Sequence, residues 1–277
     1  MSSCKILIID GYNLIHRSKS GFKLGDWPVV FNFFRSLKAE LARHKPNKCF
    51  FVIEGVPRQK AMFAEYKANR TVTAEPGSKD HDDYLKFHKQ KDVILSIMKQ
   101  IIPLDVIMNP DFEADDVIYN LIHDECKDAN AVVMSNDTDF IQLLNEFKNV
   151  KIWNPMTKSY VKGVDYDYVS WKSLTGDGSD NIPGIVGCGS VTAEAACQSE
   201  QALNECLTKY NFHDGYKRNY ELIKFHRFNE LERSNLVRWK GNSDWDQFKI
   251  ELEKMQFKSM LKEKYWNDMI KCFELCN

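Results

Sequence analysis

Three short apolar runs in the N-terminal half of the chain each end in an acidic residue. The runs cover residues 5–10, 49–54 and 131–137, and they end in Asp10, Glu54 and Asp137. Short runs that are rich in β-branched and aromatic residues predict buried strands. The fold must therefore accommodate three buried strands that each end in a carboxylate.

Helical spacing of apolar residues separates these runs. It predicts helices over 28–43, with Asp26 as the N-cap, over 93–102 and over 114–126, and a further strand over 104–108. Strands that alternate with helices predict an α/β fold with a mostly parallel sheet. Ligands bind such sheets beyond the carboxyl ends of the strands. The acids at the strand ends are therefore expected to meet at one site.

The composition is that of a globular protein. The chain has 277 residues, of which 43% are hydrophobic and 28% charged, which excludes a disordered or fibrous chain. Its apolar runs are far shorter than the ~18 residues of a membrane-spanning helix. The N-terminus lacks the pattern of a secretory signal, and the eight cysteines form no CxxC pair. We expect a cytoplasmic protein with reduced thiols, and Cys272 and Cys276 alone are weak evidence for a metal site.

Nine acids fall into five short motifs. They are Asp10, Glu54, Glu113, Asp115, Asp116, Asp137, Asp139, Asp177 and Asp180. Without them, 30 acids remain against 38 basic residues, which predicts an acidic pocket within a more basic surface. Single motifs have ordinary explanations, because acids are favoured at a helix N-terminus and in turns. The combination of all five is harder to explain in that way.

A cluster of so many carboxylates requires compensating positive charge. Two carboxylates about 5 Å apart repel by about 3 kcal/mol at an effective dielectric constant of about 20. Oxygen ligands without His or Cys favour Mg²⁺ or Mn²⁺ over zinc. Two such ions would activate water and stabilise the leaving oxygen of a phosphodiester. The acids therefore predict a metal-dependent nuclease.

Two further segments are candidates for contacts with phosphate. In residues 65–70, Lys67 and Arg70 would share a helical face and bind a scissile phosphate, and Tyr66 could stack on a base, although such a basic face is more often solvated surface. Residues 175–193 hold closely spaced glycines before a helix that we expect to begin near Ser190. The intervening segment 71–88 shows no clear period and predicts an irregular excursion.

With these motifs, the chain resembles the 5′-nuclease or flap-endonuclease superfamily. That superfamily includes the 5′-exonuclease domain of bacterial DNA polymerase I and the phage 5′-exonucleases and ribonuclease H enzymes. The likeness runs from Lys5 to about Ala195 and rests on residues 9–17, 65–70, 112–116, 135–139 and 176–193. The five motifs stand in the family's order, which makes coincidence a poor explanation.

The resemblance implies a PIN-like α/β fold with a mostly parallel sheet. Residues 1–170 would form the nuclease core, with a helical arch at about 71–88, and residues 171–277 a helix–three-turn–helix element and C-terminal helices packed on the core. The element would grip duplex DNA, often with a bound K⁺ ion. Expected DNA contacts are Arg17, Gly187, Gly189, Ser190 and Thr192.

By the same likeness, the acids divide between two Mg²⁺ or Mn²⁺ ions. Glu113, Asp115 and Asp137 would serve the first ion, and Asp139, Asp177 and Asp180 the second. Asp10 and Asp116 would complete the cluster, and Lys67 and Arg70 would stabilise the phosphate.

The sequence departs from the family pattern at three places. Glu54 stands where the family usually has Asp, Val191 stands where Lys is frequent, and the arch is short. Loss of the lysine removes a phosphate contact and predicts weaker binding to duplex DNA. A shorter arch is more similar to the phage enzymes than to cellular flap endonucleases.

We therefore expect a monomeric 5′-3′ exonuclease and flap endonuclease of a bacterial cell or a phage-infected host. Its substrates would be 5′ flaps, nicked or gapped DNA and RNA primers, including RNA·DNA hybrids, and its partners replication proteins. One alternative is a relative that binds branched DNA without cutting it. A haloacid-dehalogenase-like phosphatase would need a second Asp at position 12, which is Tyr, and a PIN-domain ribonuclease lacks the glycine-rich segment.

Overall fold

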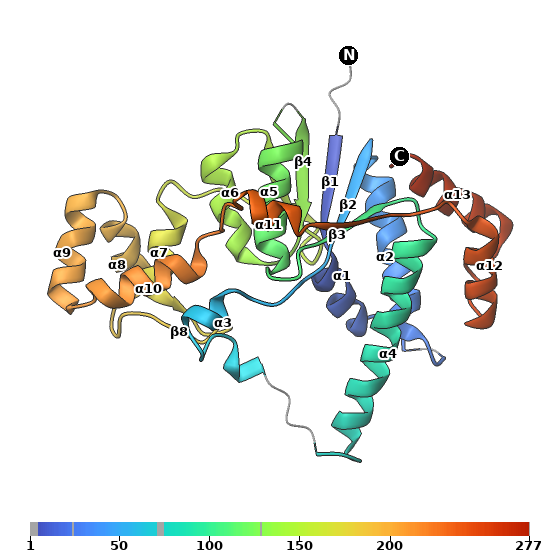
Figure 1. Cartoon of the computed structure of the whole chain (residues 1–277), viewed down its shortest axis with the longest axis horizontal. Helices are drawn as coiled ribbons and strands as arrows, with labels where there is room; N and C mark the ends of the chain where they lie inside the picture. The colour runs from blue at the N-terminus through green and yellow to red at the C-terminus, as the bar shows by residue number, and fades with distance from the viewer. Residues whose placement is uncertain (1–4, 24, 71–74, 128, 277) are drawn as a thin grey trace.

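The fold is built around a seven-stranded sheet with helices on both faces (Figure 1). The computed structural model describes residues 5–23, 25–70, 75–127 and 129–276, apart from the side chain of Arg70. The strands are β1 (Lys5–Asp10), β2 (Lys48–Val52), β3 (Asp105–Met108), β4 (Asn130–Met134), β5 (Val150–Asn154), β6 (Ser159–Tyr160) and β9 (Val237–Lys240). Their order is β6-β5-β4-β1-β2-β3-β9.

The five inner strands are parallel, as the sequence predicts. β1 pairs with β2 and β4, β2 with β3, and β4 with β5, while the edge strands β6 and β9 are antiparallel. This arrangement confirms the mostly parallel α/β fold. It also places the ends of β1 and β4 side by side, since Ile9 lies opposite Met134.

The helices lie on the two faces of the sheet or in a smaller module beside it (Figure 1). They are α1 (Gly11–Arg17), α2 (Pro28–His44), α3 (Gln59–Met62), α4 (Lys79–Gln100), α5 (Ala114–Glu125), α6 (Ile141–Glu146), α7 (Tyr168–Thr175), α8 (Ser190–Ala196), α9 (Glu200–Tyr210), α10 (His213–Ile223), α11 (Glu230–Ser234), α12 (Trp245–Lys254) and α13 (Glu263–Glu274). Leu7 and Ile9 face the core formed with α2, α4, α12 and α13. Ile6 and Ile8 face the core formed with α5 and α6. This alternation follows from the period of two in a strand.

A smaller helical module lies beside the sheet, at the left of Figure 1. It consists of α7 to α10 and a hairpin of β7 (Gly176–Asp177) and β8 (Ile182–Pro183). α7, α8 and α9 enclose a small core of their own that includes Leu174, Ala193 and Leu207. The predicted helix start at Ser190 is confirmed, because α8 begins there.

The prediction of an irregular excursion over residues 71–88 is wrong for its second half. α4 begins at Lys79 rather than Val93, with Ser78 as the N-cap. Phe87 is the first buried residue of this helix. The turns before it have no apolar face, so the sequence shows no helical period there. Figure 1 shows these turns projecting away from the sheet layers. Residues 71–74 of the expected arch lie outside the described residues.

Smaller differences concern the helix cap and the C-terminal region. Trp27, not Asp26, is the N-cap of α2, and no side-chain hydrogen bond caps this helix. No pattern of residues predicted β9, which carries Trp239. Trp239, Trp245 and Trp266 pack against the larger core. In the part of the chain that the structure describes, no helix combines the length and apolar character needed to cross a membrane.

Candidate metal centre

Asp10 is held at the end of β1 by the two neighbouring elements. It is the N-cap of α1 and accepts a hydrogen bond from the backbone N–H of Asn13 at 3.1 Å. The hydroxyl of Ser135, just after β4, donates to its other carboxylate oxygen at 2.8 Å. Burial raises the pKa of Asp10 to about 6 despite these bonds, and the charge of Asp137 adds to the effect.

A second group of acids lies beside Asp10, at the start of α5 and after β4. Glu113 is the N-cap residue of α5, and Asp115 lies in its first turn. Burial raises the pKa of Asp115 well above its ordinary value, and the charges of Asp137, Asp10 and Glu113 raise it further. These four acids, which three elements contribute, are therefore close enough to repel one another, as the sequence predicts for strand ends that meet at one edge.

A third group joins the helical module to the sheet edge. Asp177 and Asp180 lie in the β7–β8 hairpin, and Asp139 follows β4. One carboxylate oxygen of each lies within 4.8 Å of the others. Asp177 also accepts from the backbone N–H of Ser179 at 2.7 Å. The hairpin thus delivers two carboxylates to a third one from the core.

Lys172 is a residue of this site that the sequence reasoning missed. Its ammonium group contacts the carboxylates of both Asp139 and Asp177, the latter at 2.6 Å. These acids raise the pKa of Lys172, whereas the lysine lowers the pKa of Asp177 to about 2. The signal was a lysine on the buried side of α7, five residues before Asp177.

Tyr66 and Lys67 connect the second and third groups of acids. The hydroxyl of Tyr66 donates to Glu113 at 2.8 Å and to Asp180 at 3.1 Å. The ammonium group of Lys67 contacts Glu113 and lies 3.8 Å from a carboxylate oxygen of Asp180. The Tyr66 ring is buried beside these acids, and its stacking on a base stays a prediction.

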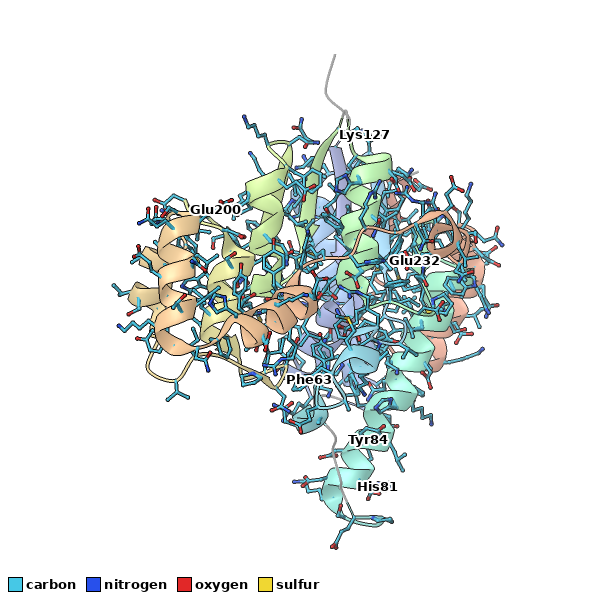
Figure 2. The ribbon with its side chains drawn as sticks, turned by 60° about the vertical axis from the view of Figure 1, so that its left-hand side comes forward. Phe63, His81, Tyr84, Lys127, Glu200 and Glu232 are labelled. Atoms are coloured by element: carbon cyan, nitrogen blue, oxygen red, sulfur yellow. The ribbon has the colours of Figure 1, made fainter. Side chains whose placement is uncertain are left out.

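The segment that carries these two residues is a turn and not a helix. Lys67 has a left-handed backbone with φ of 54°, so the prediction of a helical face shared with Arg70 is wrong. Its backbone N–H donates to the carbonyl of Asp180 at 2.9 Å, and the side chain of Asn181 donates to the carbonyl of Glu65 at 2.8 Å. The turn is therefore docked on the hairpin that holds the acids. Figure 2 shows Phe63, just before this turn, on the side of the molecule from which α4 projects.

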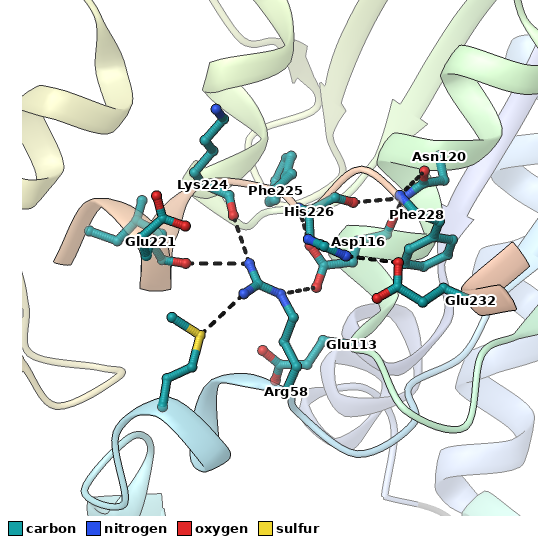
Figure 3. Close-up of polar contacts among 12 residues, drawn as sticks. Arg58, Glu113, Asp116, Asn120, Glu221, Lys224, Phe225, His226, Phe228 and Glu232 are labelled. Carbon is teal, nitrogen blue, oxygen red and sulfur yellow. Dashed lines mark hydrogen bonds and ion pairs between the residues drawn. The ribbon is translucent and has the colours of Figure 1, made fainter. Parts of the chain in front are cut away.

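Two of the predicted acids have other surroundings. Glu54 is exposed beyond the end of β2, and its charge acts on Tyr12. Asp116 is buried and accepts hydrogen bonds from the side chain of Arg58 and the backbone of His226 (Figure 3). The structure therefore does not bring either side chain into the three groups described above.

Some of the predicted DNA contacts are exposed in the structure, and Arg17 is engaged elsewhere in the protein. Gly187, Gly189, Ser190 and Thr192 are exposed on the loop before α8 and on its first turn. Gly187 has φ of 84°, and added Cβ atoms at Gly187 and Gly189 would meet open space, so their backbone is accessible. The guanidinium of Arg17 instead donates to the carbonyl of Pro155 at 3.0 Å, which makes Arg17 a support of the β5–β6 turn. The side chain of Arg70 lies outside what the structure describes.

The donor atoms of the site fit a hard divalent cation. The three residues whose ligand atoms lie within 4.8 Å of one another offer carboxylate oxygens and no nitrogen or sulfur, which is the set that Mg²⁺ and Mn²⁺ prefer. Lys67 and Lys172 supply two positive charges among the acids. Burial is the main cause of the raised pKa values of Asp10 and Asp115, and the charges of neighbouring acids add to it.

The pKa of Asp10 predicts a pH dependence of stability without metal. Its folded-state pKa of about 6 lies above the ordinary value of 3.8, so the folded chain keeps a proton that the unfolded chain releases. The free energy of unfolding therefore falls by about 2 kcal/mol as pH rises from about 4 to about 6, and it changes little above that. In EDTA, urea titrations should show this loss in the wild type relative to Asp10→Asn. If the free energy of unfolding changed with pH equally in both proteins, the raised pKa of Asp10 would be contradicted.

Comparisons with known proteins show the family of the chain. Residues 5–172 match the family model described as 5′-3′ exonuclease, N-terminal resolvase-like domain. The chain is 27% identical to a 5′-3′ exonuclease of Aquifex aeolicus, over 93% of this chain and 94% of that protein. It is 25% identical to the flap endonuclease Xni of Shewanella amazonensis, over 72% of this chain and 79% of that one. With the DNA polymerase I of Chloroflexus aurantiacus it shares 26% identity over 73% of its length, but it spans 23% of that enzyme.

Solved structures show the same fold at low sequence identity. The flap endonuclease of bacteriophage T5, in a complex with DNA and metal ions, has a TM-score of 0.68 at 15% identity, and the match covers 98% of this chain and 99% of that one. Human GEN1 in complex with a Holliday junction has a TM-score of 0.51 at 14% identity, over 91% of this chain and 68% of that one. These likenesses support a PIN-like core with a helical module beside it.

Proposed function

Because the chain belongs to the 5′-3′ exonuclease family and is a nuclease, we propose that it cuts DNA near 5′ ends with the help of divalent metal ions. The observation that carries the proposal is the meeting of Asp139 with Asp177 and Asp180, whose carboxylate oxygens lie within 4.8 Å of one another. Acids from the sheet and from the helical module would form one centre. The activity named for the relatives is that of 5′-3′ exonucleases and flap endonucleases.

The acids would hold two ions, Mg²⁺ or Mn²⁺. Glu113, Asp115 and Asp137 would hold the first, with Asp10 beside it, and Asp139, Asp177 and Asp180 would hold the second. When bound, such ions activate water and stabilise the charge on the leaving oxygen of a phosphodiester. The T5 neighbours were solved with metal ions, which supports this part of the proposal.

The two lysines would bind the phosphate that is cut. Lys67 lies against Glu113 and Asp180, and Lys172 against Asp139 and Asp177. Both ammonium groups are thus placed where they can turn from the carboxylates toward a phosphate oxygen. We propose that Arg70 assists them, because Arg binds phosphate in a bidentate manner.

The loop before α8 would hold the duplex. The accessible amides of Gly187 and Gly189, with Ser190 and Thr192, suit contacts to a phosphate backbone that read no base sequence. Exposed Val191 supplies no charge there, which favours weak duplex binding. We also propose a potassium ion at this helix–three-turn–helix element, and a division of the chain into a core of residues 1–170 and a remainder of 171–277.

The substrates would be 5′ flaps, nicked or gapped DNA and RNA primers, in replication or repair. The DNA polymerase I relatives support a role beside a polymerase. We propose that the protein acts as a monomer in the cytoplasm of a bacterial cell or a phage-infected host, together with replication proteins.

A substrate panel tests this function. Initial rates would be measured with Mg²⁺ on duplexes that differ in one feature: a 5′ flap, a 3′ flap, a nick, a gap, or an RNA primer. We expect the 5′-flap rate to exceed the 3′-flap rate by about 100-fold or more, which corresponds to about 3 kcal/mol of discrimination. Equal rates on the two flaps, or cleavage that persists in EDTA, would contradict the proposal.

A further inference from the structure

The acids of the proposed centre belong to two bodies that must be held in register. Asp10, Asp115, Asp137 and Asp139 lie on the sheet edge, whereas Asp177 and Asp180 lie on the β7–β8 hairpin of the helical module. A carboxylate that moves by 1 Å no longer fits a shared ion, because metal sites tolerate deviations of about 0.2 Å in their distances. Hydrogen bonds of α10 fix the module on the core.

Helix α10 connects the hairpin to the core. The side chain of Asn219, which is fully buried, donates to the carbonyl of Ser173 at 2.9 Å and to the carbonyl of Pro183 at 2.7 Å. Ser173 lies in α7 beside Lys172, and Pro183 lies in β8. The position of α10 therefore sets the position of the hairpin acids.

The C-terminal end of α10 is bound by Arg58. Its guanidinium donates to the carbonyls of Glu221 at 3.3 Å and Lys224 at 3.1 Å, which the helix itself leaves without partners at its end. The same guanidinium donates through Nε to a carboxylate oxygen of Asp116 at 3.4 Å. Figure 3 shows Arg58 between these carbonyls and Asp116.

The chain after α10 is bound to α5 by two side chains one helical turn apart. The other oxygen of Asp116 accepts from the backbone N–H of His226 at 2.7 Å. Asn120 donates to the carbonyl of His226 at 2.8 Å and accepts from the backbone N–H of Phe228 at 2.9 Å. Figure 3 shows Asp116, Asn120, His226 and Phe228 side by side. The side chains of Asp116 and Asn120 thus hydrogen-bond the backbone of residues 226–228 and hold it against α5.

We propose that Asp116 is a positioning residue and not a metal ligand. Both of its carboxylate oxygens are engaged by Arg58 and His226, and its side chain is 1% exposed. Asp116 lies in the first turn of α5, directly after Asp115. The pair Asp116–Arg58 therefore links the turn of the first metal to the end of α10, and through Asn219 to the hairpin acids of the second. This inference rests on the proposed metal centre.

The test compares metal binding and rate in Asp116→Asn, Arg58→Met and the double variant. Each single change breaks the link to Arg58, so we expect each to lower kcat by about 10- to 100-fold, the usual cost of losing a residue that orients a metal ligand. The double variant should be no slower than the slower single variant, because the two substitutions break the same contact between Asp116 and Arg58. Calorimetry with Mn²⁺ should still find the first ion bound in Asp116→Asn.

Two controls make the result decisive. Asp115→Asn should lose the first ion, and Arg238→Met, which removes an ion pair to Asp105 and Glu125 far along the sheet, should match the wild type. Loss of the first ion in Asp116→Asn, multiplied effects in the double variant, or a wild-type rate in Asp116→Asn would each overturn the positioning role. A wild type that binds no Mn²⁺ would instead refute the proposed function.

Discussion

Replacing Asp139 with asparagine is expected to lower the rate of 5′-flap cleavage by at least about 1,000-fold. The amide has no charge, and it would stand between Lys172 and the other acids of the third group. Metal ions supply several kcal/mol to such reactions, and about 4 kcal/mol corresponds to 1,000-fold. The measurement is the initial rate on a flap labelled at its 5′ end, over a range of Mg²⁺ concentrations.

Asp165→Asn is the matched control, because Asp165 is exposed and outside the three groups of acids. Its rate should equal that of the wild type. If Asp139→Asn cut within tenfold of the wild type at saturating Mg²⁺, Asp139 would not be a ligand of an essential ion.

Replacing Lys67 with alanine is expected to lower kcat by about 100- to 1,000-fold, with a smaller change in KM. A cation that meets the charge of the reacting phosphate contributes this much when it acts mainly in the transition state. Lys67 contacts Glu113 and Asp180, so its ammonium group lies among the proposed ligands. Steady-state kinetics on the same flap would separate kcat from KM.

The control for this prediction is Lys60→Ala, which removes an exposed lysine of α3. It should leave both constants unchanged. A rise in KM for Lys67→Ala at constant kcat would mean that Lys67 binds the ground state and the transition state equally.

The sequence predicted the elements that lie in the centre of the fold. β1, β2, β4 and α5 have apolar faces that are covered on the sheet or in its flanking layers, and burial of that kind leaves a clear period in the sequence. The outer turns of α4 have no such face, since its first buried residue is Phe87. β9 is half-buried at an edge, so its pattern was equally weak.

The candidate site could be predicted as far as residue type and strand ends determine it. Acids at the ends of β1 and β4 meet because parallel strands end at one edge. Which way a side chain turns depends on partners that are distant in the sequence. Asp116 meets His226, Lys172 meets Asp139, and Tyr66 meets Glu113. Spacing within a motif holds no information on those pairs.

The most direct test of the central claim is a crystal structure of the wild-type protein grown with Mn²⁺ and analysed by anomalous scattering. The account predicts two peaks, one in contact with Asp115 and Asp137, and one in contact with Asp139, Asp177 and Asp180. Lys172 should be turned away from Asp139 in that structure. Absence of any peak among these acids at saturating Mn²⁺, with Lys172 still between Asp139 and Asp177, would contradict the account.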